Sequence, residues 1–65
     1  MTNAQKVIEW YEKLPVNEEF KIGKVLQDTQ LTNDQLQNLR KKNSVVDKIF
    51  ERCKTDRKGY YRKSS

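Results

Sequence analysis

The first pattern of apolar and polar positions lies between residues 2 and 14. Its apolar side chains fall on one helical stripe, formed by Val7, Ile8, Tyr11 and Leu14 with Ala4 and Trp10 at its edges. Thr2 and Gln5 match a capping box, in which two side chains satisfy each other's unpaired backbone N–H groups. Pro15 disfavours helical geometry at the residue before it. The pattern predicts a helix over 2–14 whose aromatic rings belong to the core.

A shorter pattern follows after a polar connector. Phe20-Lys21-Ile22 alternates apolar and polar residues, which predicts a very short strand. The stretch from Gly23 to Gln30 predicts a helix of one or two turns that buries Val25 and Leu26. We therefore expect a strand that leads directly into a second helix.

The third helix is predicted from a second capping box, formed by Thr32 and Gln35. We expect it over 33–42, or slightly beyond, with Leu36 and Leu39 facing the core. A helix, a short turn near residue 30, a polar cap and another helix are the layout of a helix-turn-helix.

Residues 44–54 fit two patterns. A helical stripe contains Val45, Val46, Ile49, Phe50 and Cys53, but residues 48–53 also alternate in part as a strand. The polar turn 55–59 and the aromatic, β-prone residues after it favour the strand, because a terminal strand needs a neighbour. We therefore predict a β-hairpin of residues 48–54 with 59–63. Alternation along that strand places one of its two tyrosines, Tyr60 or Tyr61, in the core and leaves open which one.

Length and composition fit one small domain. The chain has 65 residues, of which 34% are apolar, so we expect one compact core and no large buried pocket. The predicted fold class is mainly α with a small β-hairpin (α+β), with a single domain over 1–63 and a disordered tail at 64–65.

The chemistry of the side chains indicates a protein without catalytic activity. The sequence has one cysteine and no histidine, so we expect neither an intrachain disulfide nor a Cys/His zinc site. A nucleophilic Ser or Cys would lack its usual base. We interpret Cys53 as a small buried apolar residue. We predict a protein that is not an enzyme, needs no cofactor or metal, does not span a membrane and is cytoplasmic.

Charge is divided unevenly along the chain. Residues 1–37 contain four Lys/Arg and six Asp/Glu, whereas residues 38–65 contain ten Lys/Arg and three Asp/Glu. Such segregation is typical of a face that meets a polyanion, although a solvated charged surface is the alternative.

The order of elements carries a resemblance to a known family. Phe20-Lys21-Ile22, the predicted helix pair 23–42 and the basic segment 52–63 together resemble the winged helix-turn-helix proteins, in particular small ones of phages and mobile genetic elements. The resemblance implies DNA binding for transcription regulation or an accessory role. It also implies that the third helix lies in the major groove while the wing touches the backbone or minor groove.

The outward face of the third helix supplies candidate base contacts. If Leu36 and Leu39 face the core, Gln37, Asn38 and Lys41 point away from it. Asn and Gln can pair with adenine and Lys with guanine, although these residues also fit an ordinary surface. The residues expected to contact the DNA backbone are Arg40, Lys42, Lys54, Arg57, Lys58, Arg62 and Lys63.

Two other binding functions stay open. An exposed tyrosine of the wing would suit stacking on single-stranded nucleic acid. Alternatively, Trp10 on the first helix would anchor a protein partner, as in an adaptor or an inhibitor of a host factor. A homodimer formed through the same helix is a further hypothesis.

Overall fold

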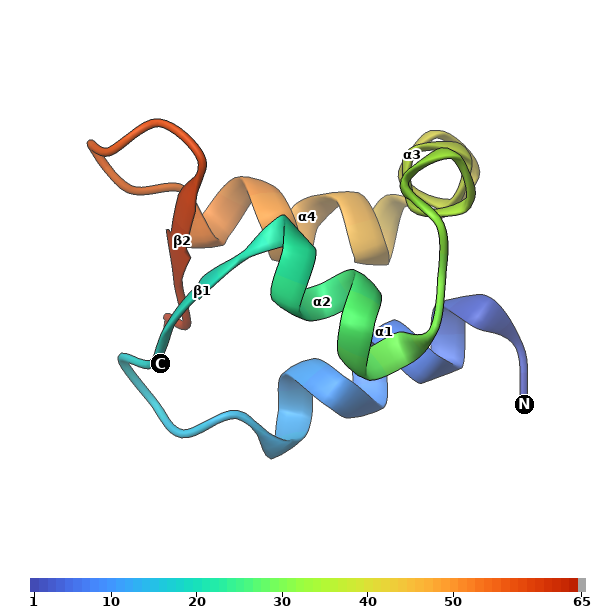
Figure 1. Ribbon diagram of the computed structural model, residues 1–65, viewed down its shortest axis with the longest axis horizontal. Helices are drawn as coiled ribbons and strands as arrows, with labels where there is room; N and C mark the ends of the chain where they lie inside the picture. The colour runs from blue at the N-terminus through green and yellow to red at the C-terminus, as the bar shows by residue number, and fades with distance from the viewer. Residues whose placement is uncertain (65) are drawn as a thin grey trace.

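The computed structural model describes residues 1–64 and contains four helices and two strands in that range (Figure 1). In chain order they are α1 (Asn3–Lys13), β1 (Glu19–Lys21), α2 (Ile22–Thr29), α3 (Asn33–Lys42), α4 (Ser44–Cys53) and β2 (Tyr60–Arg62). The prediction of a mainly helical protein with a small antiparallel β-element is confirmed. No helix in residues 1–64 is long and apolar enough to cross a lipid bilayer.

Both predicted capping boxes are present. The Thr2 hydroxyl accepts a hydrogen bond from the Gln5 N–H at 3.2 Å, and Thr32 accepts one from the Gln35 N–H at 3.1 Å. Each glutamine side chain in turn accepts from the backbone N–H of its threonine, at 3.2 and 2.9 Å. Two helices therefore begin where the local sequence predicts, and α3 has the predicted bounds.

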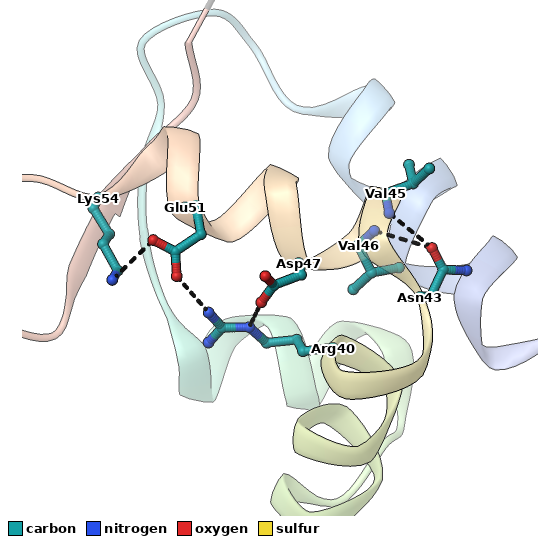
Figure 2. Close-up of polar contacts among 7 residues, drawn as sticks. All are labelled: Arg40, Asn43, Val45, Val46, Asp47, Glu51 and Lys54. Carbon is teal, nitrogen blue, oxygen red and sulfur yellow. Dashed lines mark hydrogen bonds and ion pairs between the residues drawn. The ribbon is translucent and has the colours of Figure 1, made fainter.

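Residues 44–53 form the helix α4, so the predicted strand over 48–54 is wrong. The Asn43 side chain begins this helix by accepting hydrogen bonds from the N–H groups of Val45 and Val46, at 3.0 and 3.2 Å (Figure 2). The helix also buries the apolar stripe of this segment, including Val46 and Phe50, which are fully buried. A strand would have divided that stripe between two faces.

The final strand pairs with β1 instead of with the segment before it. Glu19 faces Arg62, Phe20 faces Tyr61 and Lys21 faces Tyr60 in an antiparallel register. A single bridge between Lys54 and Tyr61 remains from the predicted hairpin of 48–54 with 59–63. The prediction of a small β-element is confirmed, but the prediction that residues 59–63 pair with residues 48–54 is wrong.

Aromatic packing accounts for this pairing. The Tyr61 ring stacks on Phe20 with centroids 5.6 Å apart and meets Phe50 edge-on at 5.8 Å. Tyr61 is therefore the core tyrosine of β2, and Tyr60 lies on the other face of the strand. The buried apolar residues are Val7, Phe20, Val25, Leu31, Leu36, Val46, Phe50 and Cys53. Cys53 is 1% exposed, which confirms its predicted burial.

The expected tail at 64–65 is described only in part. The carbonyl of Ser64 accepts a hydrogen bond from the Tyr11 hydroxyl at 3.4 Å, so this residue lies against α1. Ser65 lies outside the described residues.

Candidate nucleic-acid interface

The outward face of α3 is arranged as the sequence predicts. Gln37, Asn38 and Lys41 are exposed, while Leu36 is fully buried and holds the helix against the core. No side-chain hydrogen bond or ion pair within residues 1–64 engages these three polar residues. They are free to meet a ligand, and their role in contacting bases stays a prediction.

The Arg40 side chain is bound by residues of α4. Its Nε lies 3.1 Å from Asp47 Oδ1 and its Nη2 lies 3.2 Å from Glu51 Oε1 (Figure 2). The guanidinium also lies 5.2 Å from the centre of the Phe50 ring, and the side chain is only 17% exposed. Lys54 completes this α3–α4 charge network at 3.0 Å from Glu51. Arg40 and Lys54, both predicted to contact DNA backbone, are engaged within the protein.

The loop between α4 and β2, residues 54–59, holds a defined shape. The Thr55 hydroxyl accepts from the Arg57 N–H at 3.2 Å and donates to the Tyr60 carbonyl at 2.9 Å. Gly59 has φ of +85°, a conformation that suits glycine at the end of a tight turn. This 54–59 loop projects away from the helices (Figure 1). Its conformation is therefore largely formed before any partner arrives.

Two cations of the loop remain available to a partner. Lys58 is exposed and has no ion pair in the described chain. Arg57 is exposed and stacks on the Tyr60 ring, with its guanidinium 4.1 Å from the ring centre. Stacking covers one face of the guanidinium and leaves its N–H edge free for hydrogen bonds. Lys21 lies 4.7 Å from the same ring.

The two basic residues at the end of the chain are held by α1 and β1. Arg62 pairs with Glu19 at 3.0 Å. Lys63 donates to the carbonyl oxygens of Leu14 and Glu12, at 2.7 and 3.2 Å, where its charge favourably meets the C-terminus of α1. Both were predicted backbone contacts, and both already have partners inside the fold. Lys42 is exposed and unpaired within residues 1–64.

The sequence interpretation missed two basic residues on α4. Lys48 and Arg52 are exposed and lie one helical turn apart. The predicted strand over 48–54 does not define this outward helical face. The helical stripe of Val45, Ile49 and Phe50 was the signal that could have identified that face.

The available side chains gather at two ends of one helix. Figure 1 shows α3 beside the beginning of α4 and the 54–59 loop beyond its end. Asn43 links α3 directly to α4, and the charge network holds the two helices together. The position of α3 relative to the loop is therefore fixed by α4.

Comparisons with protein-family models, with curated proteins and with solved structures found no match for this chain. We therefore define the candidate interface from the exposure of its residues and from their side-chain partners within the fold. Its uncommitted members within residues 1–64 are Gln37, Asn38, Lys41, Lys42, Lys48, Arg52, Arg57 and Lys58.

Outside this interface, Trp10 and Asp28 form a polar contact between α1 and α2. The Trp10 indole N–H donates to Asp28 at 2.8 Å, and this bond lowers the pKa of the carboxyl group. The Trp10 ring also meets Phe20 edge-on at 5.1 Å. Its bonds within the fold give Trp10 a structural role.

Tyr11 and Cys53 meet on the inner side of α1. The thiol lies 3.7 Å from the tyrosine hydroxyl, and burial raises the pKa of Tyr11. This part-buried contact joins α1 to the end of α4.

Proposed function

We propose that this protein binds double-stranded DNA through the outward face of α3 and the 54–59 loop. The observation that carries the proposal is the presence of uncommitted polar and cationic side chains at both ends of α4. One end offers amide and ammonium groups that suit base edges. The other offers a preformed cationic loop that suits phosphates.

The dimensions are compatible with one duplex. The molecule extends 27 × 22 × 21 Å. The ten residues of α4 rise by about 15 Å, which sets the separation of α3 and the loop along that helix. A major groove about 12 Å wide admits a single helix. With α3 in such a groove, the loop approaches the neighbouring backbone.

A winged helix-turn-helix architecture is part of this proposal. The order α1, β1, α2 and α3 supports it, as does a cationic loop that leads into a strand paired with β1. The proposed wing would consist of the 54–59 loop, with α4 in place of the usual first wing strand. A regulatory or accessory role for a phage or mobile element stays a prediction from the resemblance.

The aromatic residues near the loop favour a duplex over a single strand. Base stacking requires an open ring face. Arg57 and Lys21 both lie over the Tyr60 ring, and Tyr61 packs into the core between Phe20 and Phe50. The two tyrosines of β2 therefore serve the fold and the loop.

A mobility-shift series at two salt concentrations tests the proposal, with a random duplex and its separate strands as ligands. We expect the duplex to bind more tightly than the single strand, with affinity that falls steeply as salt rises. Tighter binding to the single strand would instead support a function in binding single-stranded nucleic acid. Absence of binding to both at low salt would overturn nucleic-acid binding altogether.

Two variants divide base contacts from phosphate contacts. Lys58→Gln should weaken binding to every duplex by a similar factor, about fivefold for one charge–phosphate contact in water. Asn38→Ala should change the preference among duplexes in a sequence-selection experiment. Equal weakening on all sequences with Asn38→Ala would contradict base contacts at that position.

A further inference from the structure

The charges of α4 are sorted onto different faces of the helix. Asp47 and Glu51 lie on the flank toward α3, where Arg40 and Lys54 neutralise them (Figure 2). Lys48 and Arg52 have no carboxylate within ion-pair distance in residues 1–64. The outer face of α4 is therefore cationic, although the helix as a whole contains both signs.

Lys48 and Arg52 are also placed to act together. Four residues along a helix give a rise of about 6 Å and bring both side chains to one face. Both line an open hollow of about 500 Å³ beside Tyr11 and Lys63. Two long cationic side chains at this spacing can reach one stretch of a polyanion.

Arg52 continues this cationic surface toward the 54–59 loop. It lines a second open hollow, of about 620 Å³, together with Arg57. The acidic residues of this hollow are Glu19, which Arg62 neutralises at 3.0 Å, and Asp56. The remaining charge of the hollow is positive, because Arg52, Arg57 and Lys63 outnumber Asp56.

We infer that Lys48, Arg52 and Arg57 form a phosphate-binding track that holds one DNA strand along the outer face of α4. The track runs from the middle of α4 to the 54–59 loop, because Arg52 lines both the hollow that contains Lys48 and the hollow that contains Arg57. The ligand group is the phosphodiester, and the contact carries no sequence preference. This inference rests on the proposed binding of duplex DNA and adds the outer face of α4 to the phosphate contacts of the loop.

The test removes two charges from the track by Lys48→Gln with Arg52→Gln, since glutamine preserves helix propensity. Binding of a random duplex is measured by fluorescence anisotropy across a range of salt concentrations. Affinity should fall about tenfold or more at low salt, because two close charge–phosphate contacts are lost. The slope of log K against log salt should decrease by about 1.8, because each lost phosphate contact removes about 0.9.

A matched control removes the same charge from another face. Lys6→Gln with Lys13→Gln alters two residues that line a surface of α1 with Trp10, outside both hollows. This control should retain the slope of the unmodified protein. Far-UV circular dichroism and the thermal midpoint should be unchanged in both variants. If the α4 variant unfolds, Arg57→Gln tests the same track outside any helix, with an expected slope decrease of about 0.9.

The outcomes separate the two proposals. If the unmodified protein binds no duplex at low salt, the proposed function fails and the track fails with it. If the unmodified protein binds but the α4 variant keeps its slope, the track alone is overturned. An equal loss of slope in the control would also overturn it, because net charge would then explain binding.

Discussion

Arg40 and Arg57 belong to the same basic half of the chain but stand in opposite surroundings. Arg40 lies between two carboxylates and a phenylalanine ring and is mostly covered. Arg57 is exposed and rests on one tyrosine ring. The difference shows that acceptors brought together by the fold, more than charge density along the sequence, decide whether a cation serves stability or remains available to a partner.

The same division runs through the rest of the basic half. Lys54, Arg62 and Lys63 have partners inside the fold, whereas Lys58 has none within residues 1–64. The ten Lys/Arg of residues 38–65 therefore overstate the charge that a polyanion would meet. Substitutions can sharpen this comparison because the two groups should respond in different measurements.

The largest effect on stability is expected from Arg40→Met. This change keeps a long apolar stem over Phe50 but leaves Asp47 and Glu51 without their shared partner. We expect the free energy of unfolding to fall by about 2 kcal/mol, because charged hydrogen bonds of a mostly covered guanidinium are lost. Urea unfolding measures it. Lys41→Met, on the exposed face of the same helix, should stay within about 0.5 kcal/mol. Equal stability of the two variants would contradict the structural role of Arg40.

Lys63→Met should have a smaller effect. It removes a cation from the C-terminal carbonyls of α1, and we expect a loss of about 1 kcal/mol in the free energy of unfolding. Lys58→Met is the control, because it removes an equal charge from a residue without internal partners. Thermal unfolding should distinguish the two, and DNA binding should respond in the reverse order. A stability loss with Lys58→Met of the same size would remove the distinction between held and free cations.

Thr55→Val tests whether the shape of the loop contributes to binding. The valine has the same outline but cannot accept from the Arg57 N–H or donate to the Tyr60 carbonyl. We expect affinity for duplex DNA to fall about threefold, because ordering the loop then costs about 0.5–1.5 kcal/mol per immobilised side chain. The salt slope should be unchanged, since no cation is removed. A changed slope would indicate lost phosphate contacts instead.

The smallest effect on stability is expected at Asp28. Its carboxylate, like the guanidinium of Arg40, has a hydrogen-bond partner within the fold. Its pKa is lowered in the folded protein by the Trp10 indole. A lowered folded-state pKa stabilises the protein above the unfolded pKa, about 3.9, and this contribution is lost as pH falls through the folded pKa. Thermal midpoints between pH 7 and pH 2.5 should therefore decline less steeply in Asp28→Asn. An unaltered decline would show that the indole bond does not influence stability.

The sequence predicts the fold well where the signals are local. The capping boxes at Thr2 and Thr32 place the starts of α1 and α3 within a residue, because their hydrogen bonds span only three residues. The buried faces of these helices follow from the same periodicity. On α3 this also suffices to predict that Gln37 and Asn38 are exposed.

Contacts between residues far apart in the sequence could not be predicted from local patterns. The partner of β2 is β1, about forty residues earlier, and the pairing depends on how Tyr61 fits between Phe20 and Phe50. Because β2 pairs with β1, it needs no strand partner from residues 44–53. These residues form the helix that their apolar stripe and the Asn43 cap favour. The internal partners of Arg40 arise from that helix, so the error in secondary structure became an error in the site.

The location of Tyr61 has a consequence for biosynthesis. Its ring fills the space between two phenylalanines, one before α2 and one in α4, and β1 has no other strand neighbour in the described chain. The helices α1 to α3 can begin to form as soon as they leave the ribosome, but the core cannot close until residues 60–62 have emerged. Closure of this core is thus timed by the translation of β2. Nascent chains arrested before that point should remain sensitive to protease.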